Sequence, residues 1–340
     1  MLSFPARHPQ ALGIIYQPAG GLFVFRAGIL RKTEAVILET AKSLSIGDIY
    51  VIVTGIVMGT TARLITLKVD FRQIPSYPNA YFNCIVLGVI ASALGSIAIP
   101  AILARDFVSI TFLTVAVSQF REVRSAERDS LGKLEHTEYV RRGDAYIDGI
   151  AKTFESRNYI SLVTALASVL VMKLVDRPEE EFLTVLSGVA AGLLVLFLCY
   201  RFTKGKTVGH ICTARIGTIE VRGSELYVDG IFVTNYLGTD RSRELFRTEG
   251  IAVVLEPRDP MCRVTLENFG QRQAILFEAV RALGVKRYRF IRRHFQTGNV
   301  AIAFVPVIRD PDKLMEAVLG TPILENSRKV GRIIKTSFGG

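Results

Sequence analysis

The sequence contains few of the residues from which most catalytic and metal sites are built. Its four histidines are scattered, at positions 8, 136, 210 and 294. Its four cysteines form neither a CxxC pair nor a zinc-type spacing. No HExxH, GxSxG or GxGxxG motif occurs, and Tyr200 stands where a phosphate-binding loop ending in residues 205–207 would need glycine. We therefore expect no metal site and no bound cofactor.

Charge is scarce where the apolar residues gather. The 340 residues are 49% hydrophobic and only 21% charged, and the mean hydropathy is +0.33. A bilayer-spanning helix needs about 20 apolar residues. Buried helices of a soluble domain are the alternative, but they seldom lack interior charge this completely. The sequence predicts an integral membrane protein with spans at 47–67, 81–103, 159–175 and 182–200.

The predicted spans have no Asp, Glu or His near their centres. Because proton- and ion-coupled transporters need such groups within the membrane, a transporter or channel is disfavoured. Small residues instead recur on one face of two spans, which is typical of close helix–helix packing. These residues are Gly88, Ala91, Ser92 and Gly95, then Gly188, Ala191 and Gly192.

The number of spans is four or five. Residues 107–119 are apolar but short for a crossing. If they cross, the N-terminus lies outside and the basic residues Arg63, Lys68 and Arg72 lie inside, an arrangement that we favour. Segment 105–158 holds nine Lys and Arg, whereas the link 176–181 is DRPEEE. The positive-inside rule therefore predicts that 121–157 and the C-terminal tail are cytoplasmic.

The N-terminal extension, residues 1–45, does not have the pattern of a secretory signal. Residues 30–44 fit either a short amphipathic helix on the membrane surface or a weakly ordered leader.

Residues 121–157 are expected to form a helical hairpin that turns near Arg142–Asp144. We expect the face carrying Tyr146, Ile150 and Phe154 to pack on the charged helix at 120–135, with Gly149 allowing close approach. Ser130 and Lys133 form an SxxK pattern. A lysine made neutral by burial could serve as the base for a serine nucleophile.

Residues 204–340 predict a cytoplasmic α+β domain. Strands are expected within 211–222, 225–236, 250–255, 287–292 and 299–307, and helices at 240–248, 266–283 and from Asp310 to Gly320. This segment has 22 Lys and Arg against 14 Asp and Glu, a net of +8. Contact with anionic lipid explains that charge more simply than nucleic acid, which we do not expect as a partner.

Four stretches together resemble the YIEGIA family of polytopic membrane proteins from endospore-forming bacteria. They are GTTARLITLKVDFRQIPSYP (59–78), LGVIASALGSIAIPAIL (87–103), QFREVRSAERDSLGKLE (119–135) and YIDGIAKTFESRNYI (146–160). The signature here has Asp148 where the family name has glutamate. The resemblance covers residues 48–200 and, more loosely, the tail.

The resemblance implies a role in sporulation, in the cell membrane or the forespore membrane. Two hypotheses follow. The first is a regulator of other spore membrane proteins that acts through the hairpin motif and the tail domain, with a membrane-protein partner and homo-oligomers as candidate assemblies. The second is a membrane serine protease that uses Ser130 and Lys133. The candidate partner-binding residues are Tyr146, Asp148, Gly149, Glu155, Arg157, Arg63, Asp70, Arg72 and Tyr77.

Overall fold

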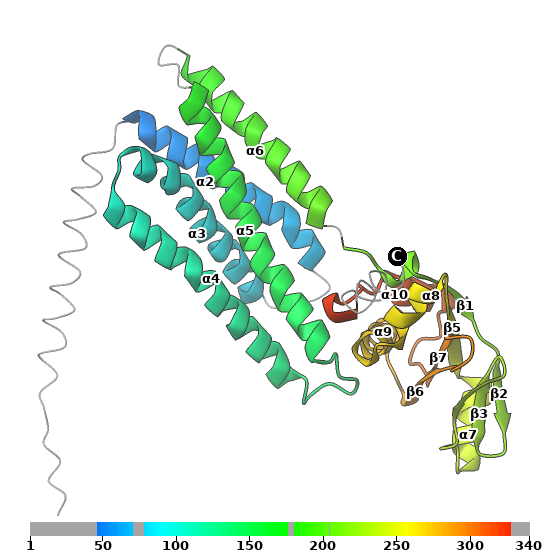
Figure 1. Cartoon of the computed structure of the whole chain (residues 1–340). Coiled ribbons are helices and arrows are strands. Elements are labelled where there is room, and N and C mark those ends of the chain that lie inside the picture. Colours follow the sequence, from blue (N-terminus) through cyan, green and yellow to red (C-terminus); the bar gives the residue numbers. More distant parts are fainter. Residues whose placement is uncertain (1–45, 71–77, 176–179, 204, 328–340) are drawn as a thin grey trace, which may run out of the picture. The chain divides into compact units, whose positions relative to one another are not determined.

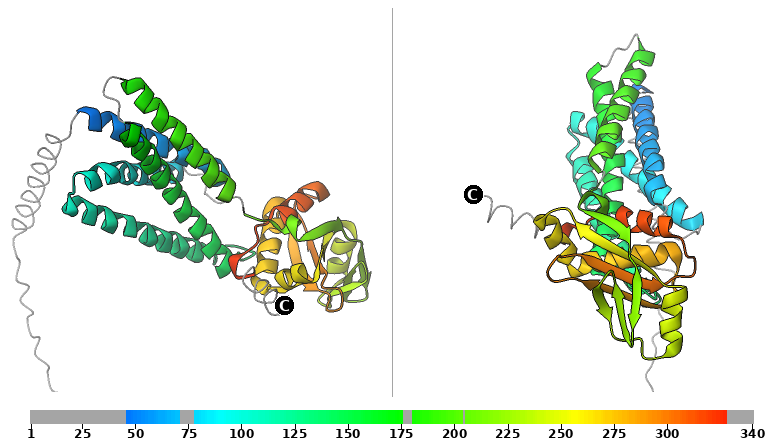
Figure 2. Two further views of the ribbon diagram at one scale, coloured as in Figure 1. Left: turned by 45° about the horizontal axis from the view of Figure 1, so that its top comes forward. Right: turned by 90° about the vertical axis from the view of Figure 1, so that its right-hand side faces the viewer.

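The computed structural model describes residues 46–70, 78–175, 180–203 and 205–327 (Figure 1). The predictions for residues 1–45 lie outside these ranges. From Val51 onward the chain forms one compact unit. Figure 2 shows its long helices, followed after residue 203 by the strands and shorter helices of the tail domain. The name tail domain is used below for the described residues 205–327.

Five long helices come first in the part of the chain that the structure describes. They are α2 (Ile46–Asp70), α3 (Pro78–Leu103), α4 (Phe107–Leu134), α5 (Asp144–Val175) and α6 (Glu181–Thr203). Four of them, α2, α3, α5 and α6, are long and apolar enough to span a membrane. Many large apolar side chains on these helices are exposed, including Val57, Phe82, Leu194 and Phe197. Such outward apolar surface suits contact with lipid.

The predicted small-residue stripes do lie at helix contacts. A side chain added at Gly95 would overlap the backbone carbonyl oxygen of Leu162 in α5. At Gly188 and Gly192 of α6, an added Cβ would meet Met172 and the Ser168 hydroxyl of the same α5. Glycine is therefore required for α3 and α6 to approach α5 this closely.

Helix α4 begins at a sharp turn and runs antiparallel to α5. Arg105 has φ +54°, and the Asp106 carboxylate caps the helix by accepting from the backbone N–H groups of Val108 and Ser109. Farther along, the ring of Phe120 meets that of Tyr159 edge-on, with their centroids 5.6 Å apart. Phe107, at the start of α4, precedes Phe120 by the same number of residues as Met172 follows Tyr159 in α5. Because both helices rise about 1.5 Å per residue, the start of α4 lies level with the last turns of α5.

The tail domain contains two antiparallel sheets. One has the order β1 (Cys212–Ile216), β5 (Ile251–Pro257), β7 (Val300–Val305) and β6 (Arg287–Arg293). The other is the meander β2 (Ile219–Arg222), β3 (Glu225–Val228) and β4 (Ile231–Thr234). The predicted meander is confirmed for these three strands, but β1 pairs with β5 in the larger sheet.

The larger sheet is buried on both faces. In β5, Val253 and Leu255 pack in one apolar cluster and Ala252 and Val254 in the other, as the period-2 alternation of a strand requires. The first cluster also contains residues of α8 (Pro260–Glu267), α9 (Phe269–Leu283) and α10 (Pro311–Gly320). The second contains residues of the meander and of α7 (Asp240–Thr248). Every residue of β7 is buried, so this strand is the centre of the domain.

Two further predictions have clear outcomes. The helix expected to start at Asp310 is confirmed, because Asp310 caps α10 and Pro311 occupies its first turn. The helix expected at 266–283 is confirmed as α9 except at its start, because α9 begins at Phe269 and a separate helix, α8, ends at Glu267. Asn268 has an extended backbone, ends α8, and caps α9 by accepting from the N–H of Gln271.

Candidate functional site at the YIDGIA motif

A tight turn positions the motif, residues 146–151, at the start of α5. Gly143 has φ +88°, a conformation that favours glycine. The Glu135 carboxylate at the end of α4 accepts from the backbone N–H groups of Arg142 and Gly143, at 2.6 and 3.2 Å. The preceding helix therefore fixes the turn, near the predicted position.

The apolar face of the motif is buried in the core of the tail domain. Tyr146, Ile147 and Ile150 share one apolar cluster with strands β5 and β7 and helix α9. The Tyr146 hydroxyl donates to the Glu278 carboxylate of α9 at 2.5 Å, and its ring meets Phe277 edge-on. The expectation that this face packs on the charged helix at 120–135 is confirmed in part, because Leu131 of α4 belongs to the same cluster, but most of the cluster lies in the tail domain.

The polar face of the motif joins α5 to α4. Asp148 accepts from Arg124 of α4 at 2.9 Å and pairs with Lys152 at 2.8 Å. Glu155 lies 3.4 Å from the same Arg124 guanidinium. Lys152 also pairs with Glu325 of the tail domain at 2.6 Å. Asp148 therefore takes part in a polar chain that connects α4, α5 and the tail domain.

Gly149 does not lie at a close helix contact. A Cβ atom added there would meet no atom within 4 Å. Close helix approach therefore does not explain this glycine.

Arg63 and Arg157 are buried among the helices, with exposed fractions of 0% and 4%. The Nε of Arg63 donates to the Cys84 carbonyl at 3.3 Å, and its guanidinium lies 5.1 Å from the centre of the Phe154 ring. Gly88 leaves the space that the Arg63 stem fills. Because Arg63 is buried inside the candidate span Asp48–Leu67, the expectation that it belongs to the basic link after the first span is wrong. A mean hydropathy taken over a long apolar segment changes little when the segment contains one arginine, so it does not reveal Arg63.

The serine and lysine of the SxxK pattern are not brought into this site. Ser130 and Lys133 are exposed on α4, so the burial that the lysine-base hypothesis requires is absent. Arg72 and Tyr77 lie outside the described residues, as does the side chain of Asp70. Within the described ranges, no group of three or more His, Cys, Asp or Glu side chains could hold a metal ion.

Burial also makes one cysteine of the tail domain unreactive. Cys212 is fully buried, and burial raises the pKa of its thiol to about 12. The described cysteines form no disulfide.

Three residues of the site were missed by sequence reasoning. Arg124, Glu278 and Glu325 hold the motif, yet each is one of many charged residues on a polar stretch. Nothing in the sequence marks Glu278 as the partner of a tyrosine 132 positions away.

The sequence comparisons match the whole of this arrangement. The family described as "YIEGIA protein" matches residues 51–332, which include the long helices, the motif and the tail domain. The uncharacterized protein YphB of Bacillus subtilis strain 168 is 36% identical over 286 residues, covering 82% of this chain and 93% of the relative. No solved structure matches the chain. The chain belongs to the YIEGIA protein family.

Proposed function

We propose that the chain is an integral membrane protein that regulates other membrane proteins during sporulation, with its tail domain in the cytoplasm. The charge distribution supports this orientation, because segment 105–158 is basic and the α5–α6 link is acidic. The endospore-forming source of the relative YphB supports the sporulation context.

The observation that carries the proposal is the continuity of α5. One helix, Asp144–Val175, bears the motif at its start and a candidate span over the rest of its length. Tyr146 binds the tail domain through Glu278, and Asp148 binds α4 through Arg124. A displacement of the tail domain must therefore act on the helix that enters the membrane. In this proposal, a membrane-protein partner responds to that movement.

The test compares two charge reversals on the same helix. Arg124→Glu places a carboxylate against Asp148 and Glu155, whereas the exposed Arg128 forms no ion pair with a described residue. Quantitative proteomics of spore membranes should show altered abundance of a set of membrane proteins when the gene is deleted. Arg124→Glu should reproduce that change, and Arg128→Glu should match wild type.

Immunoblotting first establishes that both variants accumulate in the membrane. The proposal fails if deletion changes no membrane protein, or if an accumulated Arg124→Glu variant behaves as wild type. Ser130→Ala tests the protease hypothesis in the same strains. Uncleaved substrates in that variant would favour proteolysis over a regulator without catalytic activity.

A further inference from the structure

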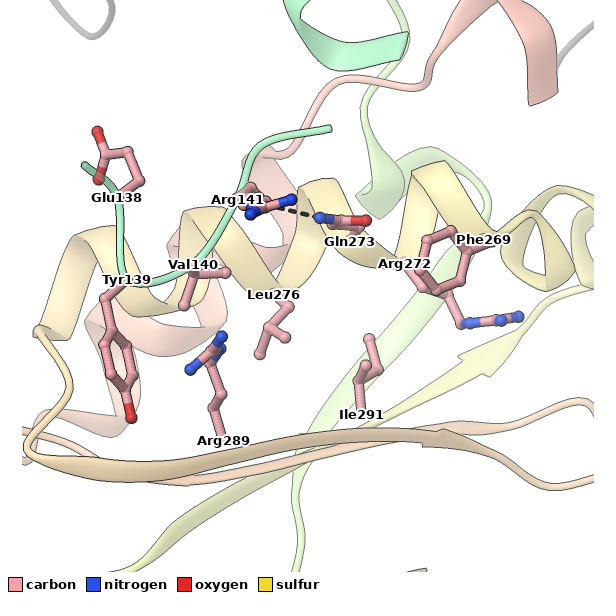
Figure 3. A pocket seen from close by; sticks show the side chains of 10 residues that line it. All are labelled: Glu138, Tyr139, Val140, Arg141, Phe269, Arg272, Gln273, Leu276, Arg289 and Ile291. Atoms are coloured by element: carbon pink, nitrogen blue, oxygen red, sulfur yellow. Dashed lines mark hydrogen bonds between the residues drawn. The ribbon is translucent and has the colours of Figure 1, made fainter. Parts of the chain in front are cut away.

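A pocket of about 480 Å³ lies between the hairpin turn and the tail domain. Residues 138–141 form one wall, and α9 and β6 form the others (Figure 3). Small-molecule sites typically enclose about 300–1,000 Å³. Its lining residues are Glu138, Tyr139, Val140, Arg141, Phe269, Arg272, Gln273, Leu276, Arg289 and Ile291.

Part of the pocket is aromatic and apolar. Tyr139 and Phe269 are 56% and 71% exposed, so both rings are accessible to a ligand in the pocket. Leu276 and Ile291 lie between them in Figure 3. This part of the pocket suits a planar ring, because aromatic side chains stack on such rings.

The rest of the pocket is cationic. Arg141, Arg272 and Arg289 line it, and none of them forms an ion pair with a described carboxylate. The two carboxylates nearby are engaged elsewhere. Glu138 pairs with Arg142 at 3.1 Å, and Glu267 pairs with Arg263 and Arg293 at 3.0 and 3.2 Å.

Backbone geometry also directs an arginine into this space. A bulge at Tyr288, whose φ is +55°, shifts the register of β6 so that Arg289 pairs with Phe304 of β7. Bulges of this kind re-aim side chains and are frequent beside binding sites. Burial lowers the pKa of the Arg272 guanidinium and the charge of Arg293 lowers it further, while the Glu267 carboxylate raises it.

A purely structural role accounts for only part of this arrangement. The Arg289 guanidinium stacks 4.3 Å from the centre of the Tyr139 ring, and Gln273 donates to the Arg141 carbonyl at 3.1 Å. These contacts hold the hairpin turn against α9. They do not explain why three arginines without carboxylate partners surround one cavity beside two exposed rings.

We propose that this pocket binds a small phosphate-bearing ligand with a planar ring, of the nucleotide class. Arginine forks match phosphate oxygens, and the aromatic walls stack on the ring. Because the ligand would touch both the hairpin turn and the tail domain, its binding would stabilise their contact. Binding can be measured without reference to the regulatory proposal, so the two can fail separately.

The test is isothermal titration calorimetry on the purified full chain in lipid nanodiscs. ADP is the probe, adenosine is the control without phosphate, and pyrophosphate is the control without a ring. ADP should bind at least about tenfold more tightly than either control, since each lacks one of the two recognised parts. Nanodiscs with and without phosphatidylglycerol separate a free nucleotide from a lipid phosphate, and ADP affinity should be similar in both.

Charge reversals provide matched variants. Arg141→Glu and Arg289→Glu should each weaken ADP binding at least about tenfold, the scale of a lost charge-assisted contact. Arg292→Glu makes the same change on β6, but Arg292 lies on the opposite face, over the Phe232 ring. It should leave ADP affinity unchanged. No measurable ADP binding, equal binding of pyrophosphate, or an equal loss in Arg292→Glu would each overturn the proposal.

Discussion

Tyr146 makes the most specific single contact of the motif. Its hydroxyl is buried and donates to a carboxylate that also accepts from Arg281. A hydrogen bond to a charged group contributes about 1.5–3 kcal/mol, and a buried acceptor that loses its donor is costly. The aromatic ring alone would keep the apolar contacts but not this bond.

Tyr146→Phe is therefore expected to lower the local unfolding free energy of the tail domain by about 1.5–3 kcal/mol. Hydrogen–deuterium exchange of the β5 and β7 peptides measures this quantity, because those strands form the buried sheet beneath α9. Tyr236→Phe is the control, since Tyr236 is 77% exposed. Equal exchange in both variants would show that the Tyr146 hydroxyl adds nothing to stability.

The sequence predicted the motif residues better than their partners. Period-3.6 spacing identified the face with Tyr146 and Ile150, and that face is buried. The spacing could not identify which part of the chain covers this face. The hydrophobic effect is not directional, and Glu278 is far from the motif in sequence. The burial of Arg63 was not predicted for a related reason, because the space beside Gly88 that its side chain fills exists only in the folded chain.

At the scale of the helix, two glycines within described helices have different surroundings. Gly95 allows α3 to contact the backbone of α5, whereas Gly149 faces open space. Alanine is favoured over glycine inside a helix by about 0.5–1 kcal/mol when nothing obstructs its Cβ. Replacing glycine by alanine should thus lower the stability of the protein at position 95 and maintain or raise it at position 149.

Gly95→Ala should lower the temperature at which the detergent-solubilised protein aggregates, because overpacking a helix contact costs about 1–3 kcal/mol. Gly149→Ala should leave this temperature unchanged or raise it. Heating followed by size-exclusion chromatography measures both. A loss of stability in Gly149→Ala equal to that in Gly95→Ala would contradict this difference.

Local signals predicted the elements well where capping chemistry is strong, as at Asp310 and Pro311. They failed at Asn268, because the helical pattern continues on both sides of it and only its extended backbone separates α8 from α9. The sheet order was also beyond the sequence. The alternation in β1 identifies a strand but not its pairing with β5.

For the whole molecule, the direction of α4 bears on the number of crossings. Phe120 is level with Tyr159 and α4 is antiparallel to α5, so Phe107 lies near the level of Met172. Exposed Phe112 and Val115 give this half of α4 an apolar surface. These observations favour five crossings, although α4 is not among the four helices that meet the length and hydropathy criteria for a span.

Cysteine labelling of intact cells tests this arrangement. In a background without the four native cysteines, Ala104→Cys should react with a membrane-impermeant maleimide from outside. Ser130→Cys, exposed near the other end of α4, should react only after the cells are opened. Protection of Ala104→Cys until lysis would instead place the turn before α4 in the cytoplasm and reduce the crossings to four.

The length of α5 limits which changes of sequence the segment between the motif and the candidate span can accept. A helix of 32 residues is about 48 Å long at 1.5 Å per residue, while the hydrocarbon core of a bilayer is only about 30 Å thick. If α5 crosses a bilayer as proposed, about a dozen of its residues stand clear of the lipid, which is enough for the motif and little more. One inserted residue between Tyr146 and Arg157 would turn these two side chains by about 100° relative to each other. An insertion or deletion in this interval is therefore expected to misalign one of its two ends.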